Sequence, residues 1–502
     1  MLHSPSRFGS ALLLTSIVLA ANASSQSETP GAKYARAKEA MASGQFAQAV
    51  ALFEELAQAF PEDPGTWMNL GLAHYMAGQP VKAIKHLERA LQMEPELVPA
   101  WLFLGTAHLD LGEPAQAIQP LRRVVAAQPK NLDARRMLAD ALFATRRYQE
   151  AAEHFRELTR LNPKSASVWY KLGQSYEALA QLAFDELEKA GRDSAYWLVL
   201  IAQTLEKSQK YANAFYFYRK ALLKQPSMRG LHQALSRVYH RTHHPEWAAV
   251  EERKEHLLGP PDCQTQKLGC EFLAGHDTDV VKLARESKTR ESYYWRVEAY
   301  NRMALEAYSQ LMRLPPSRER HELVAQLYSN QRRYREAVQE LQKALRLEPH
   351  NPQLRTQLAQ ALYQSRDYES VQRLVGKGLQ GQADSAELNF IRGDSLLQLQ
   401  RIADAIPFLE RAVKQRPALR PAHLSLGRAY LLAGRAEQAI PELSKVLDGD
   451  EDGSIHYQLA QAYQRTQQPE LAKQYLRKYQ EIQKRAVAQR EALEKEVQIT
   501  PP

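Results

Sequence analysis

The sequence predicts an all-α solenoid, a fold in which similar helix pairs stack in a row. The main observation is a period of 34 residues at which alanines recur, each followed by a bulky residue four positions later and by a proline twelve positions later. The four clearest are Ala49, Ala83, Ala117 and Ala151. Self-similarity at such a period is the signature of stacked helical repeats. The second observation is composition: 44% apolar and 25% charged residues are typical of a folded chain, and two cysteines in 502 residues exclude a disulfide-rich scaffold.

Each repeat is predicted to contain two helices. The first carries Trp-x-x-Leu-Gly, clearest at Trp67, Trp101 and Trp169. The second contains the periodic alanine and ends before the proline, because proline cannot donate a backbone hydrogen bond and disfavours helical geometry in the residue before it. We expect the alanine to lie where the first helix of the next repeat crosses. The small residue of the first helix should let the two helices approach closely; these glycines are Gly71, Gly105, Gly173, Gly393 and Gly427.

The pattern resembles the tetratricopeptide repeat (TPR) family, whose motif is W-x2-LG-x2-Y followed by A-x3-F and P. The periodic position recurs later in the chain, and Ala472 is one residue short of the 34-residue spacing. The residues at this position are Ala214, Ala248, Ala337, Val371, Ala405, Ala439 and Ala472. The resemblance covers nearly all of the chain after its N-terminal segment. It implies a right-handed α-α superhelical solenoid of about 12–13 repeats in two arrays.

Two segments depart from the pattern and match each other. Tyr176–Leu187 aligns with Tyr300–Leu311, and both lack the short glycine-containing turn between helices. Each is predicted to be a compressed repeat at which the superhelix changes pitch or direction.

The chain is predicted to divide into six parts. They are a signal peptide (1–23), a linker (24–32), a first array (33–257, compressed near 166–194), a cysteine-containing loop with degenerate helices (258–290), a second array (291–480, compressed near 291–317), and a C-terminal capping helix and tail (481–502).

The N-terminal residues have the features of an export signal. His3 and Arg7 precede the apolar run Ala11–Ala20, and Ala21-Asn22-Ala23 follows as a small-x-small cleavage pattern. The run is shorter than the roughly 20 apolar residues that span a bilayer. Cleavage would remove one of 66 basic residues and none of the 57 acidic ones, so the net charge falls from +9 to +8. We expect a periplasmic or secreted protein; the alternative is anchoring by an uncleaved N-terminal segment.

Two cysteines lie in the loop between the arrays. Cys263 and Cys270 are predicted to form a disulfide, since an exported chain meets oxidising conditions. The alternative is two reduced thiols packed as small apolar groups.

Two clusters have metal-ligand chemistry. His240, His243 and His244, near His232 and Glu251, are predicted to be surface turn residues, because no further ligands with zinc-site spacing accompany them. Asp448, Asp450 and Asp452 reproduce the start of a calcium loop, but its twelfth position is Leu459 instead of a bidentate glutamate. Helix capping is the favoured reading, and calcium binding stays open.

The resemblance also places a partner groove on the first helices. Counting along the repeats gives the lining residues Met68, Leu72, Tyr75, Leu102, Arg136, Asp140, Phe143 and Tyr170. The family's mode of gripping C-terminal carboxylates needs lysine and asparagine at groove positions that here hold residues such as Met68, Leu102 and Arg136. That mode is therefore disfavoured.

The predicted function is a non-catalytic protein-protein interaction scaffold of the bacterial cell envelope. It would hold a peptide or helix of an assembly, secretion or polymer-export partner in the concave groove. The sequence has no GxxxxGK[ST], GxSxG or HExxH motif, so we expect no enzyme activity, cofactor or metal. Nucleic acid, an integral membrane span and a small-molecule ligand are not expected. The alternative is direct binding of an acidic exported polymer such as a polysaccharide, suggested by the positive charge.

Overall fold

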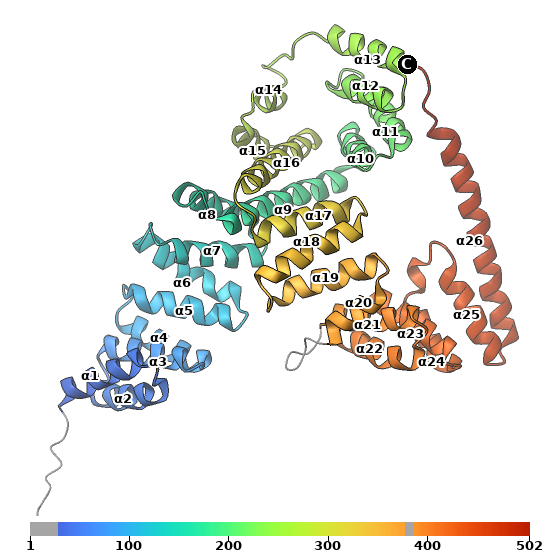
Figure 1. The fold of residues 1–502 in the computed structure, drawn as a ribbon. Coiled ribbons are helices and arrows are strands. Elements are labelled where there is room, and N and C mark those ends of the chain that lie inside the picture. Colours follow the sequence, from blue (N-terminus) through green and yellow to red (C-terminus); the bar gives the residue numbers. More distant parts are fainter. Residues whose placement is uncertain (1–28, 377–384) are drawn as a thin grey trace, which may run out of the picture. The chain divides into compact units, whose positions relative to one another are not determined.

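The computed structural model describes residues 29–376 and 385–502, and within these ranges it contains helices and no strand (Figure 1). The all-α fold class is confirmed. The predicted signal peptide, residues 1–23, lies outside the described residues. The chain divides into two compact units, residues 1–141 and 142–502.

The first unit is a row of helix pairs. Its helices are α1 (Pro30–Ala42), α2 (Phe46–Ala59), α3 (Pro64–Met76), α4 (Pro80–Met93), α5 (Val98–Asp110), α6 (Pro114–Ala127) and the greater part of α7 (Leu132–Ala144). The second helices α2, α4 and α6 each end two residues before the periodic proline, at Ala59, Met93 and Ala127. The predicted stop signal is confirmed.

The second unit begins with helices that include two unusually long ones. They are α8 (Tyr148–Leu161), α9 (Ala166–Ala190), α10 (Ala195–Lys207), α11 (Tyr211–Lys224), α12 (Leu231–Arg241), α13 (Pro245–Leu257), α14 (Lys267–Leu273), α15 (Asp277–Arg285) and α16 (Arg290–Arg313). With 25 and 24 residues, α9 and α16 are nearly twice as long as a typical helix of the repeats.

The second unit continues as another row of helix pairs. Its helices are α17 (Arg318–Asn330), α18 (Tyr334–Leu347), α19 (Pro352–Gln364), α20 (Tyr368–Gly376), α21 (Ala386–Gln398), α22 (Ile402–Gln415), α23 (Arg420–Leu432), α24 (Ala436–Ser444), α25 (Ser454–Arg465) and α26 (Pro469–Glu496), with a 3-10 turn at Leu447–Gly449. The basic segment predicted as a separate capping helix is continuous with α26, the second helix of the last pair.

The helices of a pair approach closely where a glycine of the first helix meets a leucine of the second, 16 residues later in the sequence. A Cβ added to Gly71 would lie 2.7 Å from Cγ of Leu87 on the partner helix. The same distance is 2.7 Å for Gly105 and Leu121, and 2.6 Å for Gly427 and Leu443. The periodic alanines, including Ala83, Ala117 and Ala405, are fully buried. The expectation about the glycines is therefore confirmed for these repeats. The alanines are buried, but the Cβ added to Gly71 would also lie 3.2 Å from the backbone oxygen of Ala83, so this alanine faces the first helix of its own repeat.

The structure arranges the two matching segments differently from the predicted pair of compressed repeats. Each segment is part of one unbroken helix, and α9 packs along α16. The pairing is antiparallel, since Tyr170 meets Tyr308 while Tyr176 meets Tyr300. Residues 191–289, which carry α10 to α15, connect the two ends of this pair. The two segments are thus the halves of one long helix pair, and the loop between them includes a further group of helices.

Candidate functional site

Six of the predicted groove residues lie in the first unit. Met68, Leu72 and Tyr75 lie on α3, Leu102 on α5, and Arg136 and Asp140 on α7, and each is half-buried or exposed. Met68 and Tyr75 pack against the buried cluster formed by α4 and α5. The helices α3 and α5 are in contact, so their side chains form one surface. We call the surface made by Met68, Leu72, Tyr75, Met76 and Leu102 the first-helix surface.

Tyr75 links two neighbouring first helices. Its hydroxyl donates a hydrogen bond to Oδ2 of Asp110 at 2.7 Å, and its ring lies 6.1 Å from the ring of Phe103. Burial, together with the bond to Asp110 and its negative charge, raises the pKa of Tyr75 to about 12. The hydroxyl therefore stays protonated at physiological pH, and the aromatic ring is fixed in orientation.

The predicted groove positions hold both apolar and charged side chains. Met76, one residue beyond Tyr75, keeps 45% of its surface exposed. On α7, the guanidinium of Arg136 lies 3.6 Å from Oδ2 of Asp140, four residues later on the same helix. Half-exposed methionine, leucine and tyrosine suit an apolar peptide face, and the charged pair is available for a polar contact at its edge.

The other two predicted groove residues belong to the second unit, and α16 changes the surroundings of one of them. The ring of Phe143 on α7 lies 4.9 Å from Nζ of Lys171. The ring of Tyr170 on α9 lies 6.3 Å from that of Tyr308 on α16. Burial is the main cause that raises the pKa of Tyr170, followed by the nearby carboxylate of Glu322. Tyr170 is therefore part of the contact between α9 and α16.

A cavity of about 500 Å³ lies among α10, α11, α12, α14 and α16. Its lining includes the aromatic side chains of Tyr196, Tyr218, Tyr294 and Trp295. Ligand pockets typically have volumes of about 300–1,000 Å³ and a mainly apolar lining with a few polar groups. Sequence reasoning missed this cavity, because its lining comes from segments as far apart as Tyr196 and Trp295.

One acidic side chain of the cavity is unusual. Burial raises the pKa of Glu298 on α16 above its usual value. Its Oε1 atom is buried and has no hydrogen-bond partner among the described residues. A hydrogen bond with Gln203 and the positive charges of Lys207 and Arg302 act in the opposite direction and lower the pKa of Glu298, but burial is the larger influence.

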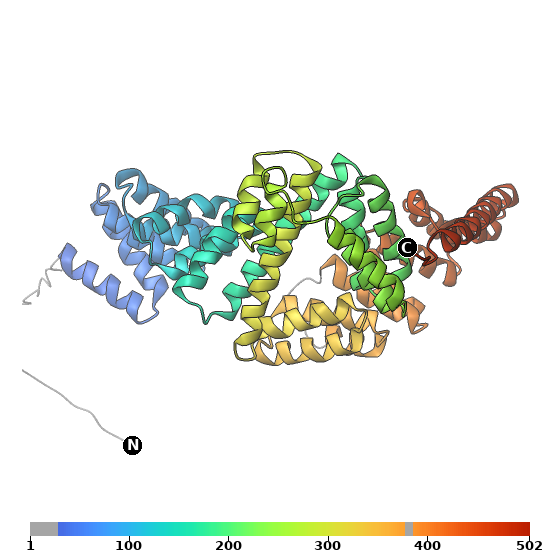
Figure 2. The same cartoon turned by 90° about the horizontal axis from the view of Figure 1, so that it is seen from above.

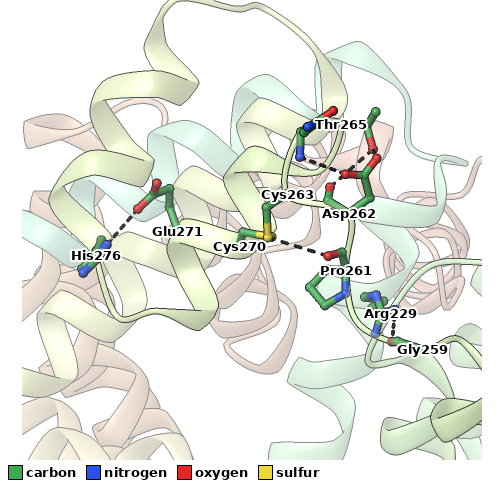
Figure 3. The surroundings of a disulfide bond; sticks show 10 residues. Arg229, Gly259, Pro261, Asp262, Cys263, Thr265, Cys270, Glu271 and His276 are labelled. Carbon is green, nitrogen blue, oxygen red and sulfur yellow. Dashed lines mark hydrogen bonds and ion pairs between the residues drawn. A yellow bond between two sulfur atoms is a disulfide. The ribbon is translucent and has the colours of Figure 1, made fainter.

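The predicted disulfide is present in the loop that contributes to this cavity. Cys263 and Cys270 are bonded, with their Cα atoms 5.6 Å apart (Figure 3). Residues of the same segment, including Gln266 and Gly269, line the cavity. A Cβ on Gly269 would lie 3.0 Å from the indole of Trp295, so the loop packs closely on α16. The disulfide therefore restrains one wall of the cavity.

The histidine-rich stretch has two kinds of surroundings. His240 and His243 are exposed, as predicted, and His244 stacks on Trp247 with the ring centroids 4.0 Å apart. His232 differs, because it is buried and its Nδ1 lies 2.5 Å from a carboxylate oxygen of Glu251. Sequence reasoning placed Glu251 near this stretch but did not identify the pair.

The His232–Glu251 pair belongs to a recurring arrangement. His321 pairs with Glu340 at 2.6 Å, and His423 pairs with Glu442 at 2.5 Å, in each case across the two helices of a pair and 19 residues apart. A lysine three residues after the glutamate binds its other oxygen, as Lys445 does with Glu442 at 2.8 Å. These triads stabilise helix pairs.

The acidic loop before α25 works as a helix cap. Asp450 accepts hydrogen bonds from the backbone N–H groups of Ile455 and His456 at 3.1 and 2.8 Å, and Asp452 accepts one from Ser454 at 2.9 Å. Acceptors at a helix N-terminus satisfy donors that have no partner within the helix. The capping reading is supported. Elsewhere in the described chain, Glu271, His276 and Asp279 have ligand atoms within 4.8 Å of one another, with His276 and Asp279 exposed. Figure 3 shows the first two, which also form a hydrogen bond of 2.8 Å.

Comparison with known families decides which class the repeats belong to. Three models described as tetratricopeptide repeat match the chain, the first at 34–97, 79–131, 102–166, 136–179 and 371–420, the second at 330–389 and 396–458, and the third at 453–485. Together these ranges span more than half of the 502 residues. The chain belongs to the tetratricopeptide repeat family. TPR proteins are generally non-catalytic interaction scaffolds.

Solved structures similar to parts of this TPR chain include MamA and YrrB. A MamA crystal structure is 21% identical, with 40% of this chain and 93% of that chain covered and a TM-score of 0.29. Another, MamA MSR-1, is 25% identical over 30% of this chain and 85% of that chain, with a TM-score of 0.28. YrrB, titled a TPR protein with an unusual peptide-binding site, is 19% identical over 40% and 89%, with a TM-score of 0.29. These TM-scores add nothing to the family assignment. No curated protein matches the chain significantly.

Proposed function

We propose that this TPR protein is a non-catalytic scaffold of the bacterial cell envelope that binds a peptide or helix of an assembly, secretion or polymer-export partner. The observation that supports it best is the first-helix surface. Met68, Leu72, Tyr75 and Met76 lie along one side of α3 at helical spacing, and all remain at least partly exposed. An amphipathic helix or extended peptide with apolar anchors fits such a surface.

Two observations support the location. The sequence begins with a predicted export signal, and the chain contains a disulfide, a bond that persists in oxidising compartments. In the described part of the chain, none of the helices has the length and apolarity needed to cross a bilayer. N-terminal sequencing of the protein from an envelope fraction should find Ser24 as the first residue; an intact Met1 on cytosolic protein would contradict export.

Site-specific crosslinking tests the binding surface. A photoreactive residue at Leu72 should capture a partner in living cells, whereas the same residue at Glu88, exposed on the second helix α4, should not. Mass spectrometry identifies the captured protein, and Tyr75→Ala should reduce its capture. Equal capture from both positions, or none from Leu72, contradicts the proposed surface.

Salt concentration distinguishes this proposal from the binding of an acidic polymer, which is favoured by the net charge of +9, or +8 after cleavage of the signal peptide. The range of charge attraction falls from about 10 Å at 0.1 M salt to about 3 Å at 1 M. Binding of a purified partner through the first-helix surface should survive this change because it depends on apolar contact. A polysaccharide held by charge should be released.

A further inference from the structure

The segment that follows α26 lies against the helices α11 and α12, more than 250 residues earlier in the sequence. Ile499 packs on the buried cluster of this region, which includes Phe215 and Tyr239. Both views show the chain leaving α26 and ending beside α12 and α13 (Figures 1 and 2). The contact is made within the second unit, by residues 497–502, which we call the distal segment.

Thr500 makes the polar contacts. The hydroxyl of Tyr239 on α12 donates a hydrogen bond to the backbone oxygen of Thr500 at 2.7 Å. The guanidinium of Arg219 on α11 donates a second to Oγ1 of Thr500, also at 2.7 Å. Val497 and Ile499 are half-buried, whereas Gln498 and Thr500 are exposed. This alternation is typical of an extended segment with one face on a surface.

The two donors are held in place by the helices themselves. The ring of Tyr239 lies 5.4 Å from that of Phe215 and 5.6 Å from that of Trp247, two residues of the helices α11 and α13. The guanidinium of Arg219 lies over the ring of Phe215 at 5.7 Å. Burial raises the pKa of Tyr239 to about 12, so its hydroxyl remains a donor. Groups that are fixed before binding lose little conformational freedom on binding.

The sequence of the distal segment suits this surface. Thr500 precedes Pro501 and Pro502, and a residue before proline is biased toward extended geometry. Consecutive prolines favour the polyproline II conformation, so Pro501 and Pro502, which are themselves exposed, reduce the conformational freedom that the segment loses on binding.

We propose that the face of α11 and α12 around Tyr239 and Arg219 is a second peptide-binding site, distinct from the first-helix surface, which recognises an extended segment of the pattern apolar-Thr-Pro-Pro. Its occupant is the chain's own distal segment. The 28 residues of α26 span roughly 42 Å at about 1.5 Å per residue and carry the segment to this face. Because the segment is tethered, its effective concentration is high, and a weak contact suffices to keep the site filled.

A chain that stops at Glu496 exposes the site for measurement. A fluorescein-labelled peptide of residues 497–502 should bind this shortened chain in a saturable way by fluorescence anisotropy. Its apparent affinity for the full chain should be at least tenfold lower, because the tethered segment competes. The full chain and the shortened chain should have equal thermal unfolding midpoints, which shows that the difference in peptide affinity does not come from unfolding of the repeats.

Matched variants of the shortened chain test the contacts. Arg219→Ala and Tyr239→Phe should each weaken peptide binding about tenfold, whereas Lys220→Ala, which removes the neighbouring exposed charge, should leave it unchanged. Failure of the peptide to bind the shortened chain overturns the proposal. So does a full chain that is dimeric in analytical ultracentrifugation and becomes monomeric on shortening, because the occupant is then a second copy. Neither result affects capture at Leu72, so the two proposals fail separately.

Discussion

The ring of Tyr308 on α16 lies directly on the backbone of Gly173 on α9. A Cβ added to Gly173 would fall 2.3 Å from Cε1 of Tyr308, closer than any comparable approach of a leucine in the other repeats. The tyrosine hydroxyl donates a hydrogen bond to Glu177, one turn further along α9, at 2.7 Å. Tyr308 thus takes, from 135 residues away in the sequence, the place that Leu87 takes against Gly71 within its own repeat.

Gly173→Ala should therefore destabilise the second unit. Although alanine is a better helix former than glycine by about 1 kcal/mol, overpacking of a filled interface typically costs about 1–3 kcal/mol. Denaturant unfolding measures the change. Gly31→Ala in α1, where no atom lies within 4 Å of the added Cβ, is the control and should be neutral or stabilising. If the Gly173 variant is as stable as the original chain, α9 and α16 can move apart to accommodate the added methyl group, and the prediction is wrong.

The periodic alanines and the first-helix surface should respond in opposite ways. Ala83, Ala117 and Ala405 are fully buried, so Ala→Leu at any of them should cost about 1–3 kcal/mol of unfolding free energy. Tyr75→Ala removes a half-exposed ring and should change the melting temperature much less, while it weakens partner capture. If Tyr75→Ala unfolds the protein as strongly as Ala83→Leu, the ring belongs to the core and the proposed surface is wrong.

Reduction of the Cys263–Cys270 disulfide should loosen the wall of the cavity. The bond closes a loop with a sequence separation of 7, for which chain entropy gives about 2–3 kcal/mol. Hydrogen exchange should become faster in α14 after reduction, and unchanged in α23, which lies in another part of the chain. Thiol counting on unreduced exported protein should find no free cysteine. Two reactive thiols in that protein would contradict the bond.

The repeat period was sufficient to predict the fold because each repeat depends on its own neighbours. Positions such as Gly71 and Ala83 act within about 34 residues, so their spacing in the sequence reports their contacts in space. The same reasoning failed at Gly173, whose partner is Tyr308. The Trp-x-x-Leu-Gly motif around Gly173 was correctly identified, but we expected this glycine to contact the second helix of its own repeat.

Contacts between residues far apart in the sequence left no pattern comparable to the 34-residue period. Nothing in the spacing of Thr500 points to Arg219 or Tyr239, and the cavity near Trp295 combines helices from distant segments. The matching of Tyr176–Leu187 with Tyr300–Leu311 was the one available indication of the long pair. It was interpreted as two similar repeats, whereas the structure shows two helices that pack on each other.

The histidine-glutamate-lysine triads predict a loss of stability in acid. Burial alone would raise the pKa of Glu442, but hydrogen bonds from Lys445 and His423 and their charges lower it below its usual value; Lys343 and His321 do the same for Glu340. A carboxylate with a lowered pKa in the folded state stabilises the fold above its unfolded pKa, about 4.3, and this stabilisation is lost as the pH falls through the folded value. The thermal midpoint of the second unit should therefore fall below about pH 4. The double substitution Glu340→Gln and Glu442→Gln should lower the thermal midpoint at neutral pH and make its decline in acid less steep. Glu88→Gln, at an exposed site on α4, should change neither. An unaltered acid profile in the double variant would show that other carboxylates dominate.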